Sequence, residues 1–150
     1  MKKLLFIIAS INFIFSQSPI NINKQEVLVM PNEAVVEVFG MVCSFCAYGL
    51  EKNLSNIDNI NSKKYTNGVF VDIDNQYLKI AFQPESQIDY KKIHSLITDA
   101  GFTPNAIYSI EKDELKQHTV DKTGKMKSMK HKHDHGDSHD HGDSHDHDNM

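Results

Sequence analysis

Between positions 33 and 111 the apolar residues follow regular periods that predict a compact α+β unit. Residues 34–39 alternate and are rich in β-branched side chains, which is typical of a strand, and Gly40 ends it. From Ser44 onward the apolar spacing changes to three and four, which predicts a helix. Gly49 lies inside this helix, where glycine costs about 1 kcal/mol relative to alanine, so we expect a packing reason for it. The buried face of the helix is expected to hold Ala47, Leu50, Leu54 and Ile57.

The second half of this unit predicts a hairpin, a second helix and a last strand. Two alternating segments, 69–73 and 78–82, are separated by the turn-like sequence Asp-Asn-Gln. Residues 93–100 carry an apolar stripe, and Gly101 follows where the end of a helix needs a residue that tolerates positive φ. Residues 105–110 supply the last strand. The order β-α-β-β-α-β predicts a ferredoxin-like fold, an antiparallel sheet with two helices on one face.

Residues 1–16 have the composition of a secretory signal peptide. Lys2 and Lys3 precede the apolar run 4–15, and Ser16 or Ser18 offers a small residue for cleavage. The run is shorter than the roughly 20 residues that span a bilayer, which favours a cleaved signal. An uncleaved anchor stays open because the small-residue pattern is weak. We therefore expect a periplasmic or otherwise extracytoplasmic protein, in contact with the membrane only through an uncleaved signal.

Three further segments lack the periodicity of the central unit. Residues 17–32 are rich in Asn, Gln, Ser and Pro and predict a linker, within which the apolar run 27–30 is an extra strand or nothing. Residues 112–130 predict a second linker, rich in Lys and containing two methionines. Residues 131–150 repeat His, Asp, Gly and Ser, and such a tail is expected to be disordered without metal.

The charge of the chain argues against nucleic acid as a partner. The formal net charge is −4, every basic residue is a lysine, and the lysines form no basic stripe. Phosphate binding needs clustered positive charge, so we expect no nucleic acid to bind.

Cys43 and Cys46 stand three residues apart where the first strand meets the first helix. The free N–H groups and the dipole at a helix N-terminus favour the thiolate, which is the form that binds metal. Two soft sulfur ligands suit Cu(I) or Hg(II), and they leave Zn(II) short of its usual four ligands. A structural disulfide and a thioredoxin-type redox pair stay open, although the lack of Trp and the strand order disfavour the redox pair.

Residues 40–46, Gly-Met-Val-Cys-Ser-Phe-Cys, resemble the Gly-Met-x-Cys-x-x-Cys signature of heavy-metal-associated domains. The resemblance continues through residues 46–54 and returns at residues 97–102, so it covers about half of the chain. Such domains occur in copper chaperones, in copper-exporting ATPases and in the periplasmic mercury-binding protein. The resemblance implies that Cys43 and Cys46 are the ligands and that Met41 packs inward beneath the loop.

Two departures from the family pattern lie outside the ligand loop. Asn59 stands where the family often has Gly, but Asn tolerates the same positive φ. Residues 61–67 form a longer stretch than usual, which makes the start of the second strand hard to place.

The C-terminal histidines form a second candidate site. They alternate with aspartates, and His-x-His brings two imidazoles to the same side of an extended chain. Near pH 7 these rings are mostly neutral and available as ligands for Zn(II), Ni(II) or Cu(II). The alternative is a solubilising acidic tail. The expected ligands are His131, His133, His135, His139, His141, His145 and His147.

Four other residues are left out of the predicted sites. Met126 and Met129 carry thioethers that suit Cu(I), but two methionines in a Lys-rich segment are more often incidental. His94 is expected on the surface of the second helix and His118 in the second linker.

Together these features predict an exported, monomeric metal carrier that is not an enzyme. Cys43 and Cys46 are expected to hold one soft ion, Cu(I) before others, and to pass it by ligand exchange to a membrane metal transporter or ATPase. The tail is expected to buffer divalent metals. The alternatives are a mercury scavenger, a thiol–disulfide exchange protein, and a Zn(II) or Ni(II) buffer in which the tail is the working part.

Overall fold

The computed structural model of the chain describes residues 17–120 and 125–131. The expected signal peptide, and all of the expected tail except its first residue, lie outside these ranges. Within them, no helix combines the length and the apolar character needed to cross a membrane.

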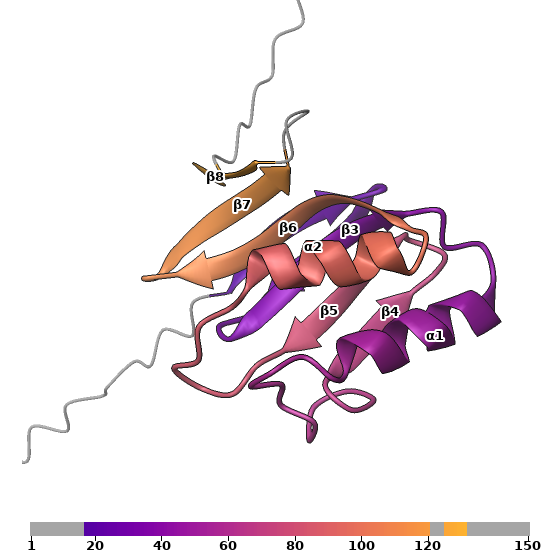
Figure 1. Cartoon of the computed structure of the whole chain (residues 1–150). Coiled ribbons are helices and arrows are strands. Elements are labelled where there is room, and N and C mark those ends of the chain that lie inside the picture. The colour runs from indigo at the N-terminus through magenta and orange to yellow at the C-terminus, as the bar shows by residue number, and fades with distance from the viewer. Residues whose placement is uncertain (1–16, 121–124, 132–150) are drawn as a thin grey trace, which may run out of the picture.

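The central unit has the predicted order of strands and helices (Figure 1). Neighbouring strands run antiparallel, and their order across this part of the sheet is β4-β5-β3-β6. This arrangement confirms the predicted ferredoxin-like fold. The elements in chain order are β3 (Glu33–Phe39), α1 (Ser44–Leu54), β4 (Val69–Asp72), β5 (Tyr77–Ala81), α2 (Tyr90–Asp99) and β6 (Thr103–Glu111).

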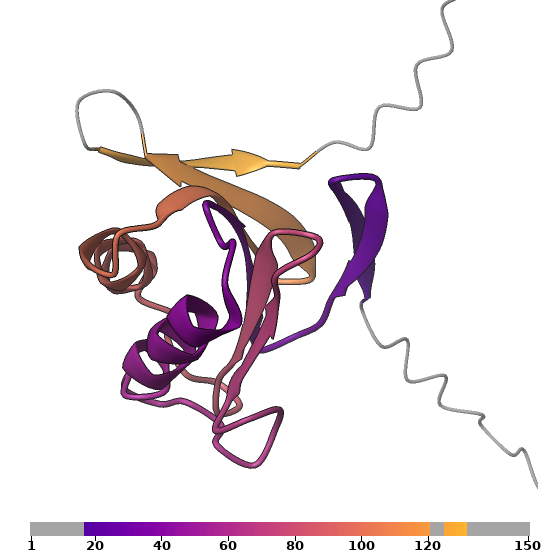
Figure 2. The same cartoon turned by 90° about the vertical axis from the view of Figure 1, so that its right-hand side faces the viewer.

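The main core lies between the sheet and the two helices, which cover the same face (Figure 2). Alternate residues of β3 point toward the helices, and helix residues three or four apart point back at the sheet. Burying one such side chain is worth about 1.5–3 kcal/mol, so these contacts fix both helices on the sheet. The side chains include Val36, Val38, Leu50, Leu54 and Ile97, each at most 1% exposed.

A capping side chain and residues that tolerate positive φ explain the helix ends and turns, whereas Gly49 differs from expectation. Asp89 caps α2 by accepting the N–H of Lys92 at 3.0 Å. Gly101 and Asn59 have φ values of +88° and +61°, which confirms the tolerance of positive φ expected at both. Gly49 is exposed, and an added Cβ would have nothing within 4 Å, so the expectation of a packing reason is wrong.

The prediction of a linker at residues 17–32 is wrong, because this segment forms the hairpin β1 (Ser18–Ile22) and β2 (Gln25–Val29). Asn23 and Lys24 both have positive φ, as the tight two-residue turns of hairpins require. The hairpin lies on the face of the sheet opposite the helices (Figure 2). Its polar residues point outward, while its inner side chains are at most 2% exposed: Ile20, Ile22, Val27 and Val29.

The inner side of the hairpin builds a second core on the sheet. Its partners come from four strands and include two tyrosines, whose rings are large enough to fill the space under a two-stranded cover. These partners are Val35, Tyr77, Ala106, Tyr108 and Leu115.

The second predicted linker, residues 112–130, is also wrong in its described part. Strand β7 (Glu114–Val120) pairs with β6, and β8 (Met126–Lys130) pairs with β7, so the sheet has six strands. Lys112 and Asp113 form the tight turn between β6 and β7, again with positive φ. Strand β7 buries only two side chains, and this explains why it has little apolar periodicity.

His118 is one of these two buried side chains and not the linker residue that was expected. It is 5% exposed, and its ring stacks on Tyr90 with centroids 3.7 Å apart. The Tyr90 hydroxyl donates to Glu111 Oε1 at 2.6 Å and lies 2.9 Å from the Ser109 hydroxyl. Burial lowers the pKa of His118, and the nearby Glu111 carboxylate only partly opposes this. The neutral ring is therefore the form that packs between α2 and the sheet.

The long loop before β4 is tied to the sheet by a buried carboxylate. Glu33 is 1% exposed, and its Oε1 accepts the hydroxyl of Tyr65 at 2.8 Å. Lys64 forms an ion pair with the same oxygen. The extra residues of this loop therefore cover Glu33 and leave the register of β4 with β5 regular.

Candidate metal centre

The loop between β3 and α1 carries the two cysteines. Strand β3 ends at Phe39, and Gly40 turns the chain with a φ of +93°, which glycine adopts without strain. Met41 then buries its side chain in the main core and is 1% exposed. This burial confirms the inward packing expected of Met41 and fixes the loop two residues before Cys43.

Cys43 is also the N-cap of α1. Its backbone is extended, with φ −140° and ψ 141°, and its Sγ accepts the N–H of Cys46 at 3.2 Å. Its carbonyl accepts the N–H of Ala47 at 3.1 Å. No acidic residue lies in the first turn of the helix. The positive end of the helix dipole therefore favours a thiolate at this position once the sulfurs are reduced.

In this structure Cys43 and Cys46 are joined as a disulfide, with their Cα atoms 5.5 Å apart. Cys46 is exposed and Cys43 is partly exposed, so a reductant or the thiol of another protein can reach the pair. Reduction adds two electrons and two protons and breaks the S–S bond. Loss of the two protons then leaves two neighbouring thiolates, and these are the species that bind metal.

An open hollow of about 600 Å³ adjoins Cys43 on the side of the β4–β5 hairpin. Phe70 and two aspartates, Asp72 and Asp74, line it. Asp72 is already engaged, because its two oxygens accept the backbone and side-chain N–H groups of Asn75 at 2.9 Å each. The hollow leaves the Cys43 sulfur approachable from this side.

Three exposed apolar residues lie close to the cysteines in the sequence, and we call Val42, Phe45 and Tyr48 the apolar rim. Val42 precedes Cys43 and is 87% exposed, and Phe45 precedes Cys46 and is 86% exposed. Tyr48, one position beyond the first turn, is also exposed. Single exposed apolar residues are common, but here three lie within two residues of a cysteine.

Gln76, at the end of the turn between β4 and β5, holds the other side of the loop. Its Oε1 accepts the N–H groups of Gly40 and Met41 at 3.0 and 3.1 Å. Its Nε2 donates to the carbonyls of Met41 and Ile73, each at 2.6 Å. The turn-like sequence predicted only a turn here, and a contact across 35 residues has no local sequence signal.

The structure describes one of the predicted tail ligands, His131, at the end of β8. Its Nδ1 lies 3.3 Å from Gln117 Oε1, and its ring meets Tyr108 edge-on with centroids 5.6 Å apart. Over residues 17–120 and 125–131, no three His, Cys, Asp or Glu side chains are grouped to hold a metal ion. The tail site stays a prediction, since its other ligands lie outside the described residues: His133, His135, His139, His141, His145 and His147.

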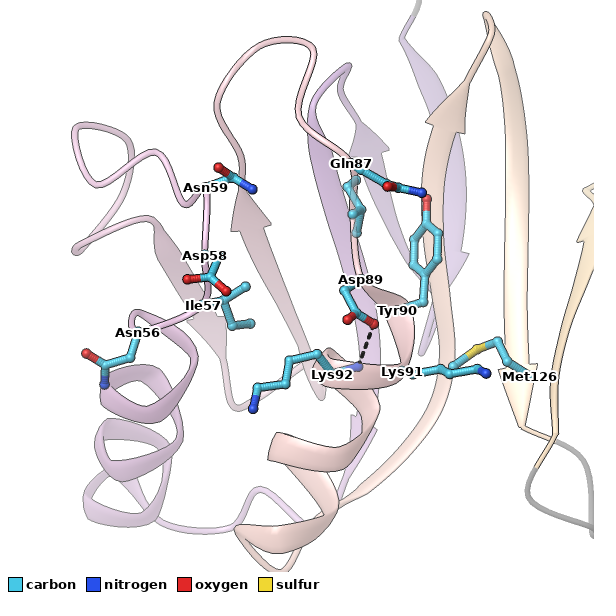
Figure 3. A pocket seen from close by; sticks show the side chains of 11 residues that line it. Asn56, Ile57, Asp58, Asn59, Gln87, Asp89, Tyr90, Lys91, Lys92 and Met126 are labelled. Carbon is cyan, nitrogen blue, oxygen red and sulfur yellow. Dashed lines mark hydrogen bonds between the residues drawn. The ribbon is translucent and has the colours of Figure 1, made fainter.

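A larger hollow, of about 720 Å³, lies where the end of α1 meets the start of α2 (Figure 3). It is lined mainly by amide, carboxylate and ammonium side chains, among them Asn56, Asp58 and Lys92. Met126 also reaches it, whereas Met129, three residues further along β8, points to the opposite face of the strand. The hollow contains neither Cys nor His and offers no pair of soft ligands.

No protein-family model and no curated protein matches the chain. Among solved structures, the chain is similar to the CopZ metallochaperone, with 22% identity over 48% of this chain and 97% of that one, and a TM-score of 0.41. It is also similar to a copper-binding domain from HMA7, a P-type ATPase, with 25% identity over 49% of this chain and 89% of that domain, and a TM-score of 0.40. The strand order of the central unit establishes its fold.

Proposed function

We propose that this chain is an exported carrier that binds one Cu(I) ion through the thiolates of Cys43 and Cys46. The observation that carries the proposal is the placement of two adjacent sulfurs at the exposed N-terminus of α1. Across the described residues, no third His, Cys, Asp or Glu joins them to form a larger ligand group. Two soft ligands alone favour a two-coordinate soft ion over Zn(II), which takes four.

The ion leaves the carrier by ligand exchange. A thiolate of the recipient bonds to the metal as the sulfur of Cys43 or Cys46 departs, so no substrate bond changes and the protein is not an enzyme. The exposure of Cys46 and the hollow beside Cys43 support such an approach. The apolar rim supports a short-lived protein contact around the ion. We propose a membrane metal transporter or ATPase as the recipient.

Export and metal buffering complete the proposal. The charged and apolar run of residues 1–16 supports secretion, and the repeat in residues 131–150 supports loose binding of Zn(II), Ni(II) or Cu(II). Cell fractionation and the mass of the mature protein test export. Deletion of residues 131–150 tests the tail, and we expect it to remove divalent binding and to leave Cu(I) binding intact.

The central experiment is an anaerobic Cu(I) titration of the reduced, full-length protein against a strong chromophoric chelator. One tight equivalent is expected for the wild type and none for the Cys43→Ala/Cys46→Ala variant. Ser44→Ala, at an exposed position between the ligands, is the matched control and should bind normally. Tight binding that survives in the double variant would refute the site. Metal analysis of protein purified under reducing conditions separates a copper carrier from a mercury scavenger.

Thiol–disulfide exchange is the second candidate function, favoured by the disulfide between Cys43 and the exposed Cys46. In this reaction a substrate thiolate attacks one sulfur, the other sulfur leaves as a thiolate, and a second exchange resolves the mixed disulfide. An insulin-reduction assay tests the reverse direction, in which a thiolate of the reduced pair attacks an insulin disulfide and dithiothreitol, added as the reductant, restores the pair. Turnover by the wild type, abolished in Cys46→Ala, would favour exchange, and no turnover from a protein that binds Cu(I) would reject it.

A further inference from the structure

We propose that Gln76 is a positioning residue for the metal centre, whose side-chain amide holds the backbone of Gly40 and Met41 and so sets the placement of Cys43 and Cys46. The inference rests on the proposed function for its meaning in metal binding. Gln76 lies on the β4–β5 hairpin, outside the β3–α1 loop that carries the cysteines, and its side-chain amide bonds to Gly40, Met41 and Ile73. It acts on the ligands through the loop.

The first reason is that the amide of Gln76 is fully used. A glutamine side chain has two N–H donors and an oxygen with two lone pairs. Here the oxygen accepts from Gly40 and Met41, and the nitrogen donates to Met41 and Ile73. Glutamate would lack both donors, lysine would lack the acceptor, and asparagine is one methylene shorter. The site therefore fits this amide specifically.

The second reason is that the loop has no other partner for these backbone groups along the sheet. The pairing of β3 with β5 ends at Glu37, and its pairing with β6 ends at Phe39. Gly40 and Met41 come directly after the last paired residue. Backbone groups left unpaired in a folded loop are unfavourable, and Gln76 satisfies three of them.

The third reason is that Gln76 is itself held rigidly. Its carbonyl accepts the N–H of Val38 at 2.9 Å, which ties the residue to β3. The turn before it is closed by Asp72, whose carboxylate accepts two bonds from Asn75. Gln76 has a φ of +57° at the end of this turn. The side-chain amide of Gln76 therefore fixes the cysteine loop relative to the sheet.

The consequence concerns the two sulfurs. Only Val42 separates Met41, which Gln76 holds by two hydrogen bonds, from Cys43. Movement of Met41 therefore moves the Cys43 sulfur relative to Cys46. A two-coordinate ion needs both sulfurs in place at once, and loss of groups that orient metal ligands typically weakens metal affinity by about 10–100-fold. Without the hydrogen bonds from Gln76, we expect the reduced loop to sample geometries in which only one sulfur faces the ion.

Gln76→Met tests the inference, since it keeps the length of the side chain and removes all four hydrogen bonds. Gln83→Met is the matched control, because Gln83 is an exposed glutamine whose amide donates to a loop carbonyl, that of Ile60, at 3.2 Å. We expect Cu(I) affinity to fall about tenfold or more in Gln76→Met and to stay near the wild-type value in Gln83→Met. Equal affinities of Gln76→Met and the wild type, with both folded, would overturn the inference.

Two readouts keep this test independent of folding and of the carrier function. In the wild-type protein, hydrogen exchange at the Gly40 and Met41 amides should be slow, and fast exchange at both would overturn the inference without any variant. In Gln76→Met these amides should exchange faster. If the wild type binds no Cu(I) at the cysteines, the carrier function fails, whereas the exchange rates still decide the role of Gln76.

Discussion

The two faces of the central sheet are covered in different ways. Two helices cover one face with a largely aliphatic core, and a two-stranded hairpin covers the other with a smaller core that contains Tyr77 and Tyr108. Met41, from the cysteine loop, belongs to the helix-side core, and the hairpin-side core, as far as the structure describes it, has no member from this loop. The metal centre and the helix face therefore share Met41. The hairpin face contributes no described core residue to the cysteine loop, and it meets the turn before Gln76 at Asn75, whose carbonyl accepts Asn23 Nδ2 at 2.9 Å.

The largest effect is expected from Ile97→Ala on the helix face. Ile97 is fully buried, and truncation of such a residue leaves a cavity that costs about 2–5 kcal/mol. Urea unfolding followed by circular dichroism measures the loss. Lys91→Ala, at an exposed position of the same helix, should change stability little. If Ile97→Ala lost less free energy of unfolding than Lys91→Ala, the helix side would not be the main core.

Ile22→Ala on the hairpin face should cost less, about 0.5–3 kcal/mol, because the hairpin can detach while the central unit stays folded. Ile22 is 1% exposed, and Leu28→Ala, at a side chain that is 41% exposed on the same hairpin, is the control. Cu(I) affinity measured by chelator competition should stay unchanged in both variants. A drop in affinity in Ile22→Ala alone would contradict the independence of the two faces.

Acidification is expected to destabilise the helix face through His118. Burial holds the pKa of His118 below its usual value of 6.5, so the unfolded chain takes up this proton at a higher pH than the folded protein does. The stability contributed by the neutral ring is complete above about pH 6.5 and is lost as pH falls toward the lower pKa of the folded state. The groups around the ring are Tyr90, Glu111 and Lys116, and of the two charged ones Glu111 opposes the shift while Lys116 adds to it.

His118→Phe should keep the stacking on Tyr90 and remove this titration. Unfolding free energies measured between pH 7 and pH 5 should then fall less steeply in the variant than in the wild type. Parallel pH profiles would show that His118 is not the group responsible.

The smallest effect is expected from Gly49→Ala, and it is stabilising. Gly49 is exposed in α1, and an added Cβ meets no atom within 4 Å, so the change should add about 1 kcal/mol through helix propensity. Thermal unfolding measures the gain. Gly101→Ala is the matched contrast and should destabilise, because φ at Gly101 is +88°. A destabilised Gly49→Ala would reveal a contact that this face of α1 makes elsewhere.

The helix face could be predicted from the sequence because its residues repeat over long segments. Val36 and Val38 in the strand, and Leu50 and Leu54 in the helix, follow the periods of 2 and 3.6. The hairpin face could not be predicted so readily. Each of its strands has five residues and buries two apolar side chains, and polar residues such as Asn, Gln and Glu separate or precede them. Its signal was the alternation of isoleucine and valine on both sides of Asn23 and Lys24.

The candidate site divides in the same way. Cys43 and Cys46 were predicted because they lie one helical turn apart and the surrounding motif is local. Gln76 was not predicted, because it meets the loop only after the β4–β5 hairpin has folded back against β3. His118 was missed for a similar reason: its partner Tyr90 lies in α2, and a lone histidine in a polar segment carries no periodic signal.

The sulfur of Cys43 accepts the N–H of Cys46, so the atom proposed to hold the ion also caps the N-terminus of α1. A thiolate is a stronger acceptor than an uncharged sulfur, and a sulfur bound to a metal has less electron density to share. Each chemical state of Cys43 therefore gives the first turn of α1 a different stability. The oxidised, reduced and loaded protein should melt at three different temperatures, so calorimetry alone can report the occupancy of the sulfur pair.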